Sequence, residues 1–145
     1  MGEVSYKKIL VPTDGSDYSY IAAEHAIYLA KITGARVYAL YVTDTDLAFR
    51  SGIHYQEDVC GMEQSGQKAT HMIKEMCEKA GIASEEIIAR GKPADAIVEM
   101  AGKNGIDLIV ISSLGMSAIE RVLIGSVSEK VMRHAKCPVL LVHSR

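Results

Sequence analysis

The sequence predicts an α/β protein with an open, five-stranded parallel sheet and helices on both faces, a Rossmann-like architecture. Three observations support this fold class. Segments typical of strands and of helices alternate along the whole chain. The strand segments are continuous apolar runs, as expected for strands that are buried on both faces. The chain has 145 residues, 48% hydrophobic and 23% charged, which suits one globular domain over residues 1–145.

The first strand and the first helix have clear boundaries. The apolar run 9–11 predicts a strand, and Pro12 ends it. Turn residues follow, and a helix begins at Ser16 or Asp17, because either side chain can cap its first turn. Gly34 is a suitable residue to end this helix.

The second strand is expected over residues 36–43, and the segment 44–57 after it shows no sustained periodicity. A connection of this length in a compact domain is typical of a functional loop. Apolar residues at helical spacing then predict a second helix, which Gly81 ends. The residues of this apolar stripe are Ala69, Met72, Ile73, Met76, Cys77 and Ala80.

The second half of the chain continues the alternation. A short strand is expected over 86–90, and a helix begins at Pro93, a residue that suits the first helical turn. The strongest strand signal covers 107–112. Ser126 opens the last helix, and 139–142 forms the last strand.

The composition argues against several classes of protein. Lys and Arg number 16 against 18 Asp and Glu, whereas proteins that bind the nucleic-acid backbone are usually basic, so we expect no nucleic-acid partner. Three scattered cysteines make no disulfide framework and indicate a reducing compartment. No apolar run approaches the roughly 20 residues of a membrane helix, and residues 1–8 lack the apolar core of a signal peptide. We therefore expect a cytoplasmic protein with no membrane association.

The segment after the fourth strand suits the binding of phosphate. Ligands of open parallel sheets bind beyond the carboxyl ends of the strands, where the strand order reverses. Gly115 and Gly125 would let an anion approach the backbone, and Ser126 opens a helix whose N-terminus offers N–H groups and partial positive charge. Two glycines and a serine are common enough that an ordinary loop and helix cap stay open as an alternative.

At these residues the chain resembles the universal stress protein family, and the resemblance covers nearly all 145 residues. ATP-binding members have a motif of Gly, two residues, Gly, nine residues, Gly, then Ser or Thr. In this chain the motif falls on Ser112, Gly115, Gly125 and Ser126, so its spacing is kept and its first glycine is replaced by serine. The other segments that resemble the family are 9–16, 40–42, 125–128 and 137–142.

The resemblance implies the strand order 3-2-1-4-5 of an adenine nucleotide alpha hydrolase-like fold, and binding of ATP with Mg²⁺. It places Pro12, Thr13 and Asp14 beside the nucleoside and the backbone of Val42 at the adenine edge. The remaining residues, from Ser112 onward, would lie beside the ribose and phosphates. The residues implied to contact the nucleotide are Pro12, Thr13, Asp14, Val42, Ser112, Ser113, Gly115, Ser117, Gly125, Ser126, Val127 and Ser128. The resemblance also implies a homodimer through the last strand, Val139 to Val142. We expect a further protein partner as well, which the sequence does not identify.

The leading hypothesis is an ATP-binding protein that acts in nucleotide-dependent stress response or signalling. We expect at most slow ATP hydrolysis, because no general base is assigned to the phosphates. A dimeric interaction protein of the same fold that does not bind ATP is the alternative, and Ser112 favours it. A small nucleotide-dependent enzyme is a third hypothesis, since the turn 14–17 loosely resembles a pyrophosphate-binding loop.

Two candidate residues have simpler interpretations. Asp14 is placed to contact a nucleotide, but a turn aspartate also commonly bonds its own backbone. His71 and Glu75 lie four residues apart on one predicted helix and could chelate a metal, but the sequence shows no third ligand and we favour a solvated helix face.

Overall fold

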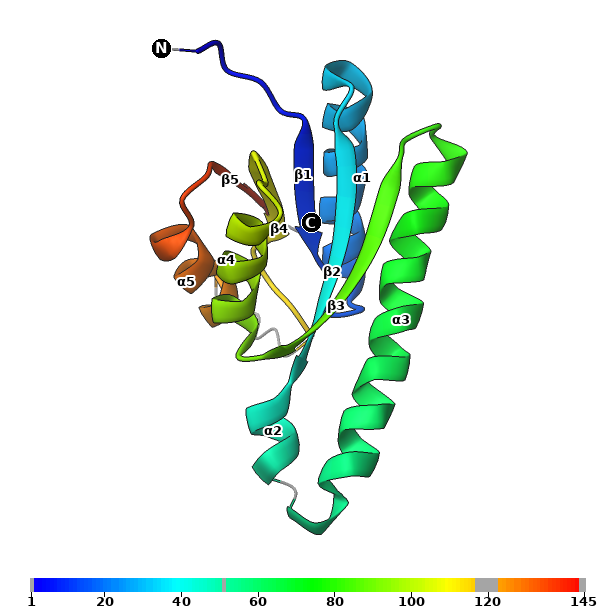
Figure 1. Cartoon of the computed structure of the whole chain (residues 1–145), viewed down its shortest axis with the longest axis vertical. Helices are drawn as coiled ribbons and strands as arrows, with labels where there is room; N and C mark the ends of the chain where they lie inside the picture. Colours follow the sequence, from blue (N-terminus) through cyan, green and yellow to red (C-terminus); the bar gives the residue numbers. More distant parts are fainter. Residues whose placement is uncertain (1, 51, 117–122, 144–145) are drawn as a thin grey trace.

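The chain folds around a five-stranded sheet in the order β3-β2-β1-β4-β5 (Figure 1). The computed structural model describes residues 2–50, 52–116 and 123–143. Every pairing in this sheet is parallel. The predicted fold class and strand order are therefore confirmed, and the carboxyl ends of β1 and β4 form the point where the strand order reverses.

Helices and strands alternate as expected, with two short additional elements between β2 and the long helix α3. The strands are β1 (Lys8–Pro12), β2 (Arg36–Asp44), β3 (Ser84–Gly91), β4 (Leu108–Ser112) and β5 (Val139–Val142). The helices are α1 (Asp17–Thr33), α2 (Thr45–Arg50), a 3₁₀ turn η1 (Gly52–His54), α3 (Tyr55–Lys79), α4 (Pro93–Lys103) and α5 (Ser126–His134). Within the described ranges, no helix has both the length and the apolar character needed to cross a membrane.

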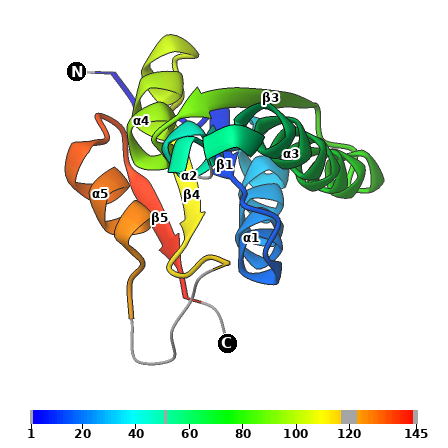
Figure 2. The same cartoon turned by 90° about the horizontal axis from the view of Figure 1, so that it is seen from below.

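The sheet separates two apolar layers, with α1 and α3 on one face and α4 and α5 on the other (Figure 2). Successive residues of a strand point to opposite faces, so each central strand supplies both layers. Val11 and Ala39 pack in the layer of α1 and α3, whereas Leu10 and Leu40 pack in the layer of α4 and α5. Burial on both faces explains the unbroken apolar runs of the sequence.

The ends of α1 lie where the sequence predicts them. The Ser16 hydroxyl oxygen accepts a hydrogen bond from the N–H of Ser19, which caps the helix. At the other end Gly34 adopts φ 76°, and its N–H donates to the carbonyl of Ala30. This is the left-handed cap for which glycine is preferred.

The segment 44–57 is not the irregular loop that we expected, because it forms α2, η1 and the start of α3. The side chain of Asp44 accepts a hydrogen bond from the N–H of Leu47 and so caps α2. The rings of Phe49 and Tyr55 then meet edge to face, with centroids 6.4 Å apart. A helix of six residues with one buried side chain, Ala48, produces no periodic signal that sequence analysis can detect.

The predicted stripe on α3 is also only partly correct. Ala69, Ile73 and Cys77 are buried, whereas Met72 is 47% exposed. The buried residues Ala69, Ile73 and Cys77 are spaced four apart and form the line of α3 that faces the sheet. Met72 lies to the side of this line on the helix surface. Cys60 lies on the first half of α3 and is exposed. Burial raises the pKa of the Cys77 thiol to about 11, so this cysteine is part of the core.

Two glycines on α3 provide a test of how closely this helix approaches the sheet. A Cβ at Gly66 would overlap the ring of Tyr41 on β2, whereas a Cβ at Gly61 would meet open space. Gly66→Ala should therefore destabilise the fold by about 1–3 kcal/mol through overpacking. Gly61→Ala should stabilise it by up to about 1 kcal/mol through helix propensity. Urea unfolding measures both, and a Gly66→Ala protein as stable as Gly61→Ala would contradict this packing.

Candidate functional site

The loops that follow β1 and β4 are joined directly at the carboxyl edge of the sheet. Asp14, just after β1, accepts a hydrogen bond at Oδ2 from the N–H of Met116 in the loop after β4, at 2.7 Å. The N–H of Thr13 donates to the carbonyl of Leu40 on β2 at 2.8 Å. The ends of β2, β1 and β4 are therefore held together where the strand order reverses.

The start of α5 is attached to the end of β4 by two further bonds. The N–H of Gly125 donates to the carbonyl of Ser113, and the hydroxyl of Ser128 donates to the carbonyl of Ser112, both at 2.6 Å. The structure thus brings together three of the predicted segments: the β1 turn, the β4 loop and the N-terminus of α5. Ser117, the remaining predicted residue of the β4 loop, lies outside the described residues.

The hydroxyl of Thr13 shapes the β1 turn from within. It accepts the N–H of Gly15 at 3.1 Å and lies 2.7 Å from the hydroxyl oxygen of Ser19. The Ser19 hydroxyl donates in turn to the carbonyl of Ser16 at 2.7 Å, so Thr13 is the donor to Ser19. Thr13 is buried and its hydrogen bonds are satisfied, so its side chain holds the turn in shape.

Asp14 combines the two interpretations that its sequence position allows. Its Oδ1 accepts the N–H of Ser16 at 3.0 Å, which is the turn aspartate of the simpler interpretation. Its other oxygen reaches across to Met116, and the residue is exposed. The pKa values of Tyr20 and Tyr41 are raised by burial and, second, by the charge of Asp14. The carboxylate therefore lies near two phenol groups at the carboxyl ends of β1 and β4. We call this place, where the strand order reverses, the β1–β4 crevice, because open parallel sheets bind their ligands there.

The backbone conformation at the motif positions of β4 and its loop suits the residues found there. No non-glycine residue in the described ranges has a positive φ, so Ser112 occupies the first motif position without backbone strain. Its hydroxyl donates to the carbonyl of Leu114 at 2.6 Å. Gly115 and Gly125 also lack positive φ values. The space around them differs: an added Cβ would lie 2.5 Å from Asp14 Oδ2 at Gly115, which forces a shift, and 3.3 Å from the Ser113 carbonyl oxygen at Gly125, which is a tight contact.

The N-terminus of α5 offers backbone donors. Gly125 is its N-cap, and the first intrahelical bond joins the N–H of Glu129 to the Gly125 carbonyl. The amides of the first turn, at Ser126, Val127 and Ser128, have no acceptor within the helix. Ser126 is exposed, whereas Ser128 is buried and its hydroxyl is already bonded. An anion at this end would therefore meet amide groups and the Ser126 hydroxyl.

Val42 lies on β2 beyond the end of β1. The last registered pair of β1 and β2 is Pro12 with Leu40, whereas β2 continues beside β3 to Asp44. The Leu40 carbonyl faces β1, and alternate residues of a strand direct their backbone groups to the same side. The N–H and carbonyl of Val42 therefore face the side where β1 has ended, as the predicted contact with an adenine edge requires.

Two groups at this edge were not predicted from the sequence. The first is the Met116 amide, because a backbone donor has no signature in residue type. The second is Thr43, which follows Val42 and whose buried hydroxyl oxygen has no hydrogen-bond partner among the described residues. Whether the hydroxyl of a threonine in a strand has a hydrogen-bond partner cannot be predicted from residue type.

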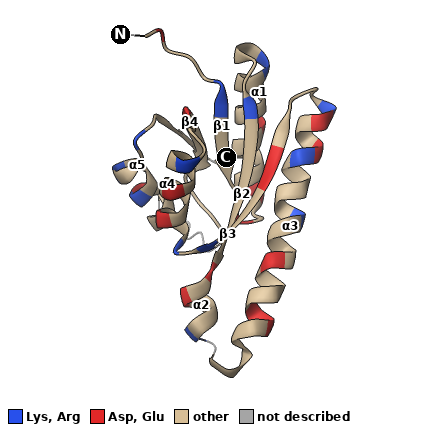
Figure 3. Cartoon of the chain, in the orientation of Figure 1, with Lys and Arg blue, Asp and Glu red and all other residues tan. Residues whose placement is uncertain are grey.

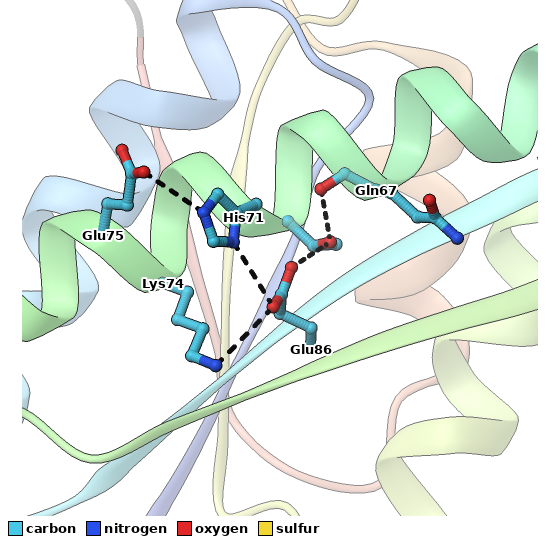
Figure 4. Close-up of polar contacts among 6 residues, drawn as sticks. Gln67, His71, Lys74, Glu75 and Glu86 are labelled. Atoms are coloured by element: carbon cyan, nitrogen blue, oxygen red, sulfur yellow. Dashed lines mark hydrogen bonds and ion pairs between the residues drawn. The ribbon is translucent and has the colours of Figure 1, made fainter.

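The candidate metal pair lies elsewhere, on α3, and forms ion pairs (Figure 4). His71 lies 3.2 Å from Glu75 through Nε2 and 3.8 Å from Glu86 of β3 through Nδ1. Lys74 lies 4.0 Å from the same Glu86 oxygen, and Thr70 donates to the other at 2.8 Å. In the described ranges, no three His, Cys, Asp or Glu side chains are grouped so that they could hold a metal ion. The cluster therefore ties α3 to β3.

A hollow of about 640 Å³ also lies apart from the β1–β4 crevice, along the first half of α3 beside β3. It contains none of the residues that sequence analysis assigns to the nucleotide. The residues that line it are Tyr55, Gln56, Val59, Cys60, Glu63, Gln64, Gln67 and Arg90. The candidate site at the ends of β1 and β4 is therefore identified from its hydrogen bonds and from the sheet topology, and this hollow is not part of it.

Comparison with known proteins identifies the family. The sequence model of the Universal stress protein family matches residues 5–143. The chain is 43% identical to the universal stress protein MJ0531 of Methanocaldococcus jannaschii, over 97% of this chain and 84% of that protein. The solved structure of MJ0577, from the same organism, has a TM-score of 0.89 at 31% identity and covers 98% of this chain and 99% of that one. A universal stress protein in complex with cAMP has a TM-score of 0.74 at 28% identity, over 97% of this chain and 99% of that one. With a family match over nearly its whole length and a relative of this identity, the chain belongs to the universal stress protein family.

Proposed function

We propose that this chain acts as one domain over residues 1–145 that binds ATP, with Mg²⁺, at the β1–β4 crevice and serves nucleotide-dependent stress response or signalling. The observation that supports this most is the junction of Gly125 with Ser113, at 2.6 Å. It holds the first-turn amides of α5, which have no acceptor within the helix, beside the end of β4. The residue at this junction is a glycine, so no side chain blocks the approach of a ligand. Such a helix N-terminus favours phosphate through its N–H groups and its partial charge.

The nucleoside end of the site is supported by Asp14 and Val42. Asp14 presents an exposed carboxylate whose oxygens each accept one N–H and keep a second lone pair for a ligand. The backbone of Val42 faces the side on which β1 has ended. A relative at 28% identity was solved with cAMP, an adenine nucleotide, which agrees with an adenine ligand in this family.

The proposed role is nucleotide sensing with at most slow hydrolysis. Asp14 is already bonded to two backbone amides, which makes it a poor general base for water. Mg²⁺ would bind chiefly through phosphate oxygens, as this ion usually does. Cytoplasmic action is part of the proposal, and the three cysteines, all free, agree with a reducing compartment.

We also propose a homodimer through β5. The support for it is that the two edge strands of the sheet differ in charge. β5 lies at one edge, contains no charged residue, and has Leu140 38% exposed. The other edge strand, β3, carries Glu85, Glu86 and Arg90 (Figure 3). Charged residues on an edge strand discourage pairing with another chain, and an apolar edge invites it. Two copies can therefore pair through β5 about a two-fold axis.

The same edge also supports the second candidate function, a dimeric interaction protein that does not bind ATP. The replacement of the first motif glycine by Ser112 favours it, although Ser112 is free of backbone strain. Binding of nucleotide decides between the two functions.

Mg-ATP should raise the melting temperature of the protein. A ligand at 100 times its dissociation constant stabilises the folded state by about 2.7 kcal/mol. AMP at equal concentration should give a smaller shift, because it lacks the phosphates nearest the start of α5. Differential scanning fluorimetry measures both shifts, and no shift at millimolar Mg-ATP would favour the interaction protein.

Gly125→Val should abolish ATP binding and leave the fold intact. The φ of –70° and ψ of 159° at Gly125 are accessible to valine, but its methyl groups would fill the space beside the first amides of α5. Isothermal titration calorimetry measures the affinity, and circular dichroism must remain native. Unchanged affinity in a folded variant would place the phosphates elsewhere.

Ser112→Gly should bind ATP as tightly as the natural protein or more tightly. The change restores the motif glycine and removes only a hydroxyl that bonds the Leu114 carbonyl. Glycine in a strand should lower stability by about 0.5–1 kcal/mol. If affinity falls at least tenfold, Ser112 itself contacts the ligand.

Leu141→Pro should convert the dimer to a monomer. Pro138 and Val142 give their carbonyls to Ile109 and Ser113 of the β4 side, so the backbone groups of Leu141 face the free edge. Proline there removes a donor from the dimer ladder and keeps the pairing with β4.

Val139→Thr is the matched control for this change, because it keeps the backbone donor at the same edge. Light scattering at tens of micromolar should report a dimer for the natural protein and for this control. A monomeric natural protein would refute the assignment of β5 as the interface.

A further inference from the structure

We propose that Asp14, Gly115 and the Met116 amide form one unit across the crevice, in which Gly115 is required by the Asp14 carboxylate and Met116 positions that carboxylate. The steric part of this proposal is independent of any ligand. Its part in nucleotide affinity rests on the proposed function.

The carboxylate of Asp14 is fixed at both oxygens. Oδ1 accepts the N–H of Ser16 in its own turn at 3.0 Å, and Oδ2 accepts the N–H of Met116 at 2.7 Å. Hydrogen bonds to a charged acceptor are among the stronger ones in proteins. Moving Oδ2 would break the contact that joins the β1 turn to the β4 loop.

Gly115 is the residue over which this carboxylate lies. A Cβ at Gly115 would approach Asp14 Oδ2 to 2.5 Å, and the next nearest atom is Asp14 Cγ at 3.7 Å. Both neighbours belong to one side chain. The φ of Gly115 is not positive, so the left-handed conformation that favours glycine does not explain this residue. The requirement for glycine at this motif position therefore originates in Asp14.

Gly125, the other glycine of the motif, has a different neighbour. A Cβ there would lie 3.3 Å from the Ser113 carbonyl oxygen and would meet no atom of Asp14 among its nearest contacts. The two motif glycines therefore serve separate contacts. A substitution at Gly125 is thus a control for the coupling between Gly115 and Asp14.

A double-mutant cycle on the ligand-free protein tests the steric part. Gly115→Ala should lower the equilibrium constant for folding about tenfold in the natural background and by less than twofold in an Asp14→Ala background. Gly125→Ala should have the same effect in both backgrounds, because uncoupled sites are additive. Urea unfolding measures all six proteins. An equal loss from Gly115→Ala in both backgrounds would overturn the proposal.

The positioning role is tested at Met116 with a matched pair. Met116→Pro removes the N–H, whereas Met116→Ala keeps it. The proline variant should lose ATP and AMP affinity by the same factor, at least tenfold, since the unit lies at the nucleoside end. The alanine variant should stay within twofold. Affinity lost by both variants, or by neither, would overturn the positioning role.

Hydrogen exchange keeps the test decisive if the proline variant does not fold. The Met116 amide should exchange slowly in the natural protein and at least tenfold faster in Asp14→Ala. Equal exchange in the two would overturn the proposal. If the natural protein binds no ATP, the proposed function fails, and the unfolding cycle and hydrogen exchange still decide whether the unit exists.

Discussion

The pairing of β1 with β4 is the constraint on which the rest of the site depends. These strands are not consecutive, yet they lie side by side and share only the short register of Ile9 with Leu108 and Leu10 with Ile109. Carboxylates extend this short ladder at both ends. Asp107 accepts the amides of Lys7 and Lys8 at the amino end, at 2.8 and 2.9 Å, and Asp14 accepts the Met116 amide at the carboxyl end. The two strands are therefore joined by carboxylate side chains beyond both ends of their short paired segment.

The fold could be predicted because its signals are local. Strands buried on both faces are apolar at every position, so 9–11 and 107–112 were recognisable without any tertiary information. The signal fails where burial is slight. α2 buries only Ala48, and α3 extends below the sheet, so its first half lacks the apolar stripe that marks residues from Ala69 onward (Figure 1).

The candidate site could be predicted only in outline, because much of its chemistry belongs to the backbone. Spacing and family resemblance selected Gly115 and Gly125, yet the reason for Gly115 is the nearby Asp14 carboxylate and was not visible in the sequence. Met116 contributes an amide that any residue except proline would supply. Ser112 replaces the first motif glycine without backbone strain, since no non-glycine residue in the described ranges has a positive φ, a fact that residue type alone does not reveal.

A site made largely of backbone groups depends on the path of the chain more than on individual side chains. Ser113 illustrates this, since its N–H donates to the Val142 carbonyl of β5 and its carbonyl accepts the N–H of Gly125 at the start of α5. One peptide segment thus connects the free edge of the sheet to the helix end that is proposed to hold phosphate. The two bonds measure 2.9 and 2.6 Å, and Ser113 itself is buried. The apolar edge and the start of α5 are therefore linked through one residue at the carboxyl end of β4.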